Sequence, residues 1–161
     1  MTRRRDRRAD AGLRRRLGAL LEELRLDPPL TPERLCARLS GRRGRPIELV
    51  AWALPPETVS GFLLVYEHKD VIVHQSRTSA LHQRHIVFHE VAHLVLDHEG
   101  CGQAPVPPED RPPGAGPATL YDDLEEWEAE TAATILSSWG EAAPEPSSRL
   151  GAALGMPGPW R

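Results

Sequence analysis

The sequence contains little cysteine and a single lysine. Its two cysteines, Cys36 and Cys101, lie in unrelated contexts and lack the Cys-x-x-Cys spacing of zinc and redox motifs. This excludes a disulfide framework and a cysteine-rich zinc site, so we expect a protein of the reducing cytoplasm. Lys69 is the only lysine among 20 lysine and arginine residues. A GC-rich genome produces the same ratio, so the arginine content by itself indicates no function.

Long hydrophobic runs are also missing. No apolar run approaches the roughly 20 residues that a membrane-spanning helix needs. The first arginines are not followed by an uninterrupted apolar segment, so we expect no secretory signal, and nearby acidic residues argue against a transit peptide. The sequence shows neither an internal repeat nor a helix-turn-helix domain. Its 161 residues are enough for one domain with a moderate core.

The formal net charge of −3 conceals two ends of opposite sign. Residues 1–16 contain eight arginines and two aspartates, whereas residues 89–161 contain thirteen acidic residues and three arginines. The basic end suits a solvated arm or a contact with a polyanion, and the acidic end suits neither nucleic acid nor a membrane surface. No aromatic residue or recognition motif lies among the first arginines, so direct nucleic-acid binding is the weakest of our hypotheses.

Hydrophobic periodicity predicts an α+β domain at residues 11–140. We expect a disordered basic arm before it, at residues 1–10, and a tail containing proline and glycine after it, at residues 141–161. Helices are predicted from about residue 11 to 26, from the N-cap Thr31 to Leu39, from about 80 to 97, and from the N-cap Asp122 to about Trp139.

Three runs rich in branched and aromatic residues predict strands between the second and third helices. They cover residues 47–54, 61–67 and 71–75. The gap at residues 68–70 suits a hairpin turn, so we expect a small, mainly antiparallel three-stranded sheet packed against helices. Six prolines at residues 100–117 predict an irregular loop there.

The stretch HIVFHEVAHLVLDH, which begins at His85, places four histidines and a glutamate in an apolar run. Residues four apart lie on the same face of a helix, so His89 and His93 present their imidazoles side by side, as two ligands of one zinc ion do. Glu90 lies about 100° around the helix, where it reaches a water on the metal. There it can take a proton from that water and pass it to a leaving amine. The pattern therefore predicts a Zn²⁺ site.

A catalytic zinc also needs a third protein ligand and an open position. His98 lies five residues after His93 and points away from the ligand face, so it is better suited to shaping the pocket. His85 lies one turn before His89, but three ligands along one straight helix give poor tetrahedral geometry. His82 has no special claim. The third ligand is therefore expected from another element.

The acidic helix that begins after Asp122 offers such a ligand. Glu126 and Glu130 lie one turn apart, beside small residues such as Ala133 that permit close approach to another helix. We assign Glu126 to the metal and expect Glu130 to accept the N–H of a ligating imidazole. Glu125 and Glu128 are interpreted as surface charges.

The segment HQRHIVFHEVAHLVLDH at residues 82–98, followed by EEWEAETAATIL at 125–136, resembles the ImmA/IrrE family of zinc metallopeptidase-like proteins. GRRGRPIELV and GFLLVYEHKDVIVHQ are similar to the strand region of compact members, so the resemblance covers roughly residues 40–140. It implies a zincin-like minimal core. It also implies these roles: Zn²⁺ ligands His89, His93 and Glu126, and catalytic base Glu90.

Proteins of this kind are similar to proteases that cut a helix-turn-helix repressor in trans. The resemblance therefore implies a zinc-dependent endopeptidase that cuts a separately encoded repressor of stress or mobile-element genes. His98 or Tyr121 would supply a hydrogen bond to the oxyanion. The alternative is a regulatory binding module that holds zinc without proteolysis, as one partner of a toxin–antitoxin or phage-immunity pair.

Overall fold

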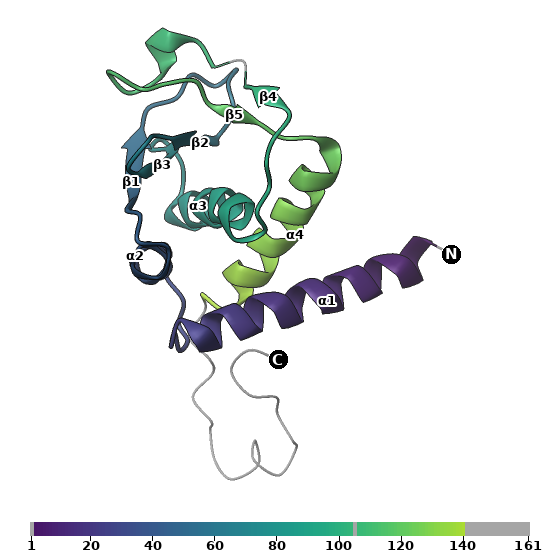
Figure 1. Ribbon diagram of the computed structural model, residues 1–161. Helices are drawn as coiled ribbons and strands as arrows, with labels where there is room; N and C mark the ends of the chain where they lie inside the picture. Colours follow the sequence, from purple (N-terminus) through teal and green to yellow (C-terminus); the bar gives the residue numbers. More distant parts are fainter. Residues whose placement is uncertain (1, 105, 141–161) are drawn as a thin grey trace.

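The computed structural model describes residues 2–104 and 106–140, and the predicted tail at 141–161 lies outside the described residues. Along the chain the elements are α1 (Thr2–Glu23), α2 (Pro32–Arg43), β1 (Ile47–Trp52), β2 (Gly61–Val65), β3 (Asp70–Gln75), α3 (Ala80–Val95), β4 (Gly102–Gln103), the 3-10 helix η1 (Pro108–Asp110), β5 (Thr119–Leu120) and α4 (Asp123–Ser138) (Figure 1). The predicted α+β class is confirmed. In the described part of the chain, no helix is both long and apolar enough to cross a membrane.

The three-stranded sheet has the order β1-β3-β2 and is mixed. The turn between Val65 and Asp70 joins β2 and β3 into the predicted antiparallel hairpin, but β1 pairs with β3 in parallel, with Ile47 opposite Asp70. The prediction of a mainly antiparallel sheet is therefore wrong for one of the two pairings. The hairpin turn fixes only its own two strands. The connection at residues 53–60 is long enough to bring the chain to the far edge of β3, the most buried strand.

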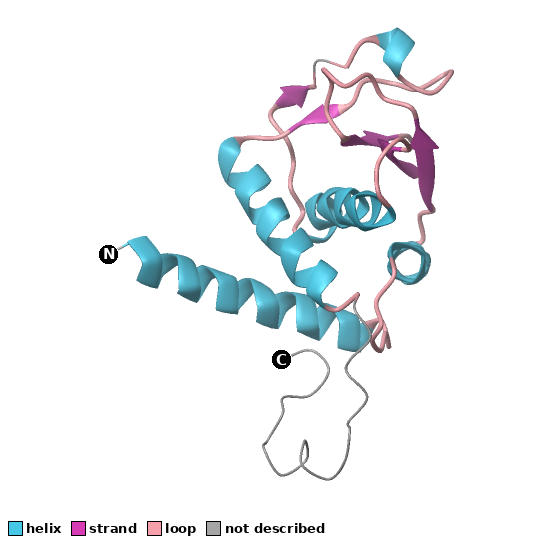
Figure 2. Cartoon of the chain, turned by 180° about the vertical axis from the view of Figure 1, so that it is seen from behind, coloured by secondary structure: helices cyan, strands magenta, loops and turns pink. Residues whose placement is uncertain are grey.

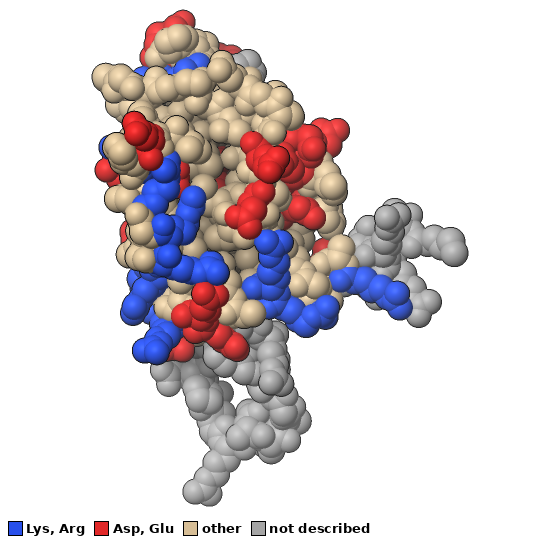
Figure 3. Space-filling model, viewed as in Figure 1, with Lys and Arg blue, Asp and Glu red and all other residues tan. Residues whose placement is uncertain are grey.

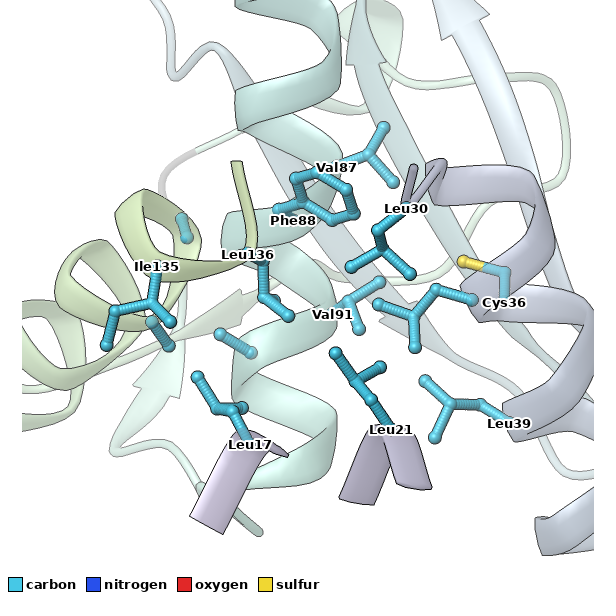
Figure 4. Close-up of a cluster of buried hydrophobic side chains, with 14 of the residues drawn as sticks. Leu17, Leu21, Leu30, Cys36, Leu39, Val87, Phe88, Val91, Ile135 and Leu136 are labelled. Carbon is cyan, nitrogen blue, oxygen red and sulfur yellow. The ribbon is translucent and has the colours of Figure 1, made fainter. Parts of the chain in front are cut away.

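Helix α3 lies between the sheet and α4, and α1 crosses the side of these helices that faces away from β4 and β5 (Figures 1 and 2). Leu17 and Leu21 of α1 meet Phe88 and Val91 of α3 and Leu136 of α4 in one buried cluster (Figure 4). A helix that is covered on several sides must be apolar around most of its circumference, and this explains the apolar run on both sides of the histidines.

Helix α1 begins at Thr2 and so includes residues 2–10, which were expected to form a disordered arm. Arginine and alanine are good helix formers, so the composition of this arginine-rich segment favours continuation of the helix. The leucine face nevertheless anchors the helix as predicted, since Leu17 and Leu21 are fully buried.

Helix α2 starts as predicted and ends later. Thr31 is the N-cap, because its hydroxyl oxygen accepts a hydrogen bond from the Arg34 backbone N–H, and Pro32 occupies the first turn. The helix continues to Arg43 instead of Leu39. Gly44 ends it in the left-handed conformation at φ 61°, which glycine adopts without strain.

The proline-rich loop before α4 is more ordered than predicted. It contains the short antiparallel pair β4–β5 and covers the face of the sheet that α3 leaves open. Val106 and Ala118 of this loop pack against Phe62 and Val73 of the sheet. The Arg111 guanidinium holds the loop together by donating hydrogen bonds to backbone carbonyls on both of its sides. The sheet therefore has two covered faces.

Candidate metal centre

Two helices supply the candidate centre. His89, Glu90 and His93 lie on α3, whose first turn is capped by Ser79, and Glu126 lies on α4. Asp122 is the predicted N-cap of α4, and it forms a capping box with Glu125. Helix α4 has three buried alanines, Ala129, Ala132 and Ala133, in the core cluster that also contains the apolar side of α3. Because these side chains are small, the two helices can approach closely.

The three predicted ligands converge on one point. The Nε2 atoms of His89 and His93 lie 3.2 Å apart, and the Glu126 carboxylate lies 3.1 Å from His89 Nε2 and 3.7 Å from His93 Nε2. A tetrahedral zinc with bonds of about 2.0–2.1 Å places its ligand atoms roughly 3.3 Å from one another. The 3.1 Å distance is to Glu126 Oε2 and the 3.7 Å distance is to Oε1. With one ligand atom from each residue, His89, His93 and Glu126 form a group whose atoms lie within 4.8 Å of one another and that could hold a metal ion.

Glu90 lies beside this group and is not one of the convergent ligands. Its side chain is almost fully buried, with 6% of the residue exposed. Burial, followed by the negative charge of Glu126, raises the Glu90 pKa to about 8. A carboxyl group whose pKa lies near neutrality can both accept and release a proton at physiological pH, which is the property of a general base that later acts as an acid.

His93 is fully buried and is held in its neutral form. Burial, followed by the neighbouring His89 and His98, lowers its pKa to about 3. The Tyr121 ring stacks on the imidazole at 3.5 Å between centroids, with 10° between the ring planes. A metal-ligating imidazole must be neutral, and this environment supplies that form at every physiological pH.

Glu130 lies next to the second nitrogen of His89. Its Oε2 atom is 3.4 Å from His89 Nδ1, and its two carboxylate oxygens are 3.1 and 3.2 Å from His85 Nε2. Partial burial acts to raise the Glu130 pKa, but the hydrogen bond and positive charge of His85, together with His89, outweigh burial and lower it. Glu130 therefore faces His89 as a carboxylate, the form that accepts an imidazole N–H.

The interpretation of Glu125 and Glu128 as surface charges is wrong. One Glu125 oxygen accepts hydrogen bonds from the backbone N–H groups of Glu99 and Gly100, at 3.1 and 3.3 Å. The Glu128 carboxylate lies 3.1 Å from His98 Nε2. The sequence contained a signal for these contacts. Glu125 and Glu128 are three residues apart, so their carboxylates share one face of α4, and this face lies toward α3.

His98 and Tyr121 lie behind His93. Both line a pocket with Arg43 and Arg45 at the C-terminal end of α3, whereas His89 and Glu90 line another pocket, which meets an earlier part of the same helix. The structure thus brings His98 and Tyr121 into contact with His93, without placing them in the pocket that holds Glu90. Their role as oxyanion donors stays a prediction.

The pocket with His89 and Glu90 is a cleft of about 320 Å³ between the start of β2 and the helices α3 and α4. Residues 59–61 line this cleft on the side of the sheet, and no motif in the sequence marked them as part of a site. A Cβ atom at Gly61 would lie 2.4 Å from Ile86 Cγ2, so only glycine lets β2 approach α3 this closely beside Glu90. The first residue of this strand therefore sets the width of the cleft.

Comparisons of the chain with known protein families, with curated proteins and with solved structures found no match. The resemblance to ImmA/IrrE proteins stays a prediction that depends on the residues at 82–98 and 125–136.

Proposed function

We propose that the protein is a cytoplasmic, zinc-dependent endopeptidase of the ImmA/IrrE type that cuts a separately encoded helix-turn-helix repressor of stress or mobile-element genes. One observation carries the proposal: His89, His93 and Glu126 converge at 3.1 to 3.7 Å, with the buried Glu90 beside them. Two imidazoles and one carboxylate form the ligand set of many catalytic zinc sites, which leave one position open.

Each of these side chains has a defined task in the proposed reaction. Zinc, when bound, would activate a water molecule and polarise the scissile carbonyl. His93 is kept neutral by burial and binds through Nε2, and the Glu126 carboxylate offsets part of the ion's charge. A Glu90 oxygen accepts the proton of the attacking water and later delivers it to the nitrogen of the leaving amine. Glu130 holds the His89 ring from its Nδ1 side.

Metal content and cleavage together test the proposal. We expect about one zinc in the wild type and in Glu90→Gln, and a large loss of zinc in Glu126→Ala, because Glu90 lies outside the convergent group. Helix-turn-helix repressors from the same genome should be cut by the wild type and left intact by Glu90→Gln. Cleavage that survives Glu90→Gln, or a wild type without zinc after reconstitution, would contradict the proposal.

A regulatory binding module is the second candidate function. Leu124 and Trp127, which lie one turn apart on α4 beside the centre, are 64% and 41% exposed, and exposed apolar side chains suit a protein contact. In this case Glu90→Gln would keep the biological activity, whereas His93→Ala would abolish it. The two variants therefore separate proteolysis from association.

A further inference from the structure

We infer that Glu128 and His98 are positioning residues, which fix the ring orientation and the tautomer of the metal ligand His93 through a chain of hydrogen bonds. The inference rests on the proposed metal site. The chain runs from the Glu128 carboxylate to His98 Nε2, at 3.1 Å, and from His98 Nδ1 to His93 Nδ1, at 2.9 Å. The side chains of His98 and His93 are 5% and 0% exposed, so the bond between the two imidazoles is shielded from bulk water, whereas the Glu128 side chain is 43% exposed.

The chemistry of the three groups determines where the protons lie. A carboxylate can only accept a hydrogen bond, so the proton of His98 belongs on the Nε2 atom that faces Glu128. His98 Nδ1 is then an acceptor, and the proton on His93 belongs on Nδ1. His93 Nε2 is left with its lone pair, and it is this atom that faces His89 and Glu126. The reverse arrangement would put a proton on His93 Nε2 and block the metal position.

The turn after α3 places His98 against His93. The Asp97 backbone N–H bonds to the Leu94 carbonyl, and the His98 N–H bonds to the carbonyl of His93 at 3.0 Å. These two bonds, with Asp97 at φ 56°, form the Schellman motif that ends many helices. The motif folds the chain back by one turn, so the ring of His98 returns to the ring of His93.

Helix α4 holds this turn in place. Glu125 accepts hydrogen bonds from the two backbone N–H groups that follow His98, and Glu128, one turn later on the same helix, reaches His98 itself. Glu126 lies between them and approaches the ligand atoms of His89 and His93. One helix thus carries both a proposed ligand and the carboxylates that orient another ligand from behind.

His98 acts through His93 and not on a substrate. It lines the pocket at the C-terminal end of α3, whereas the cleft with His89 and Glu90 is a separate pocket along an earlier part of the helix, and His98 does not line it. A group that orients a ligating imidazole changes metal affinity, and loss of such a group typically weakens binding by roughly 10- to 100-fold. Affinity for the metal is therefore the quantity to measure.

The experiment is a zinc titration against a chromophoric chelator, together with the absorption spectrum of the Co²⁺ form. We expect Glu128→Ala and His98→Phe to raise the zinc dissociation constant by roughly 10- to 100-fold and to change the Co²⁺ spectrum. Glu128→Gln keeps an acceptor oxygen, so it should retain most of the affinity. Asp123→Asn, on the same helix and exposed, is the matched control and should behave as wild type.

Thermal melts in excess chelator establish that each variant is folded. Equal zinc affinity in wild type, Glu128→Ala and His98→Phe would overturn the inference, and so would an equal loss in Glu128→Gln and Glu128→Ala. No zinc binding by the wild type would overturn the inference and the proposed function together. The readout is affinity and not cleavage, so a failure of the positioning chain alone is distinguishable from a failure of the protease proposal.

Discussion

The two thiols of the protein lie in opposite environments, and this predicts their reactivity. Cys36 is 3% exposed among the leucines of the core, whereas Cys101 is exposed. At pH 8 an alkylating reagent should modify one cysteine of the native protein and two in denaturant, as counted by mass spectrometry. The control is Cys101→Ser, which should show no native labelling. Rapid native labelling of Cys36 would show that the α1–α2 contact is open.

Cys36 also predicts how stability depends on pH. Burial, followed by the negative charge of Glu33, raises the Cys36 pKa from 9.0 to about 12. Because the folded-state pKa lies above the unfolded value, the stabilising contribution is complete below pH 9 and is lost as the pH rises toward 12. Relative to Cys36→Ala, the wild type should lose about 1.4 kcal/mol of unfolding free energy per pH unit in this window. Urea titrations of both proteins measure the difference, and parallel curves would contradict the prediction.

Gly61 is the residue at which the cleft tolerates no side chain. An alanine Cβ there would lie 2.4 Å from Ile86 Cγ2 and 3.0 Å from the Val73 carbonyl oxygen. Gly61→Ala should therefore lower the free energy of unfolding by about 1–3 kcal/mol, the usual penalty of overpacking. Gly41 is the control, because it lies inside α2 with open space around it, and Gly41→Ala should stabilise by about 0.4–1 kcal/mol. Urea unfolding measures both, and equal effects would contradict the packing argument.

At the scale of elements, the start of α4 depends on Asp122. Its carboxylate accepts hydrogen bonds from the Leu124 and Glu125 backbone N–H groups, both at 2.9 Å. Asp122→Ala should lower the free energy of unfolding by about 1 kcal/mol, the typical loss for an N-cap. Asp123→Ala keeps the cap and serves as the control in the same urea titration. A similar loss in both variants would mean that general negative charge at the helix end, and not the cap, is responsible.

Local rules explain why some of these features could be predicted from the sequence. The caps at Thr31 and Asp122 depend on residues two or three positions away, and the pairing of His89 with His93 depends only on the helical period. Glu126 could be assigned because a second helix with small residues is the natural neighbour of the first. All of these features follow from sequence separations of a few residues, or from the packing of one helix on another.

Contacts set by the path of the chain could not be predicted. The position of β1 on the far side of β3 depends on how residues 53–60 cross the sheet, and neither strand encodes that path. The contact of Glu128 with His98 requires the left-handed turn at Asp97, and aspartate is not the usual residue there. The sheet topology and the contact of Glu128 with His98 were therefore missed for the same reason.

At the scale of the whole molecule, the separation of charge found in the sequence persists on the surface. In Figure 3 the largest group of acidic residues on this face lies apart from most of the Lys and Arg residues, and a smaller acidic group lies among them. Exposed acidic residues cluster at the start of α4 and in the turn after α3: Asp97, Glu99, Asp122, Asp123 and Glu126. A negative field near the proposed centre attracts cations and repels polyanions, which agrees with the assignment of a metal site here.

Metal binding should couple this centre to the stability of the whole fold, because the ligands join α3 to α4 and converge only in the folded chain. An ion that binds only the folded state at 100 times its dissociation constant adds about 2.7 kcal/mol of unfolding free energy. For a chain of this size, that corresponds to a rise in melting temperature of roughly 5–10 °C. Differential scanning calorimetry with zinc and with excess chelator should show this difference for the wild type and for Glu90→Gln. Glu126→Ala should lose most of it. A full shift in Glu126→Ala would mean that the stabilising ion binds away from the convergent atoms of His89, His93 and Glu126, and the proposed centre would then be wrong.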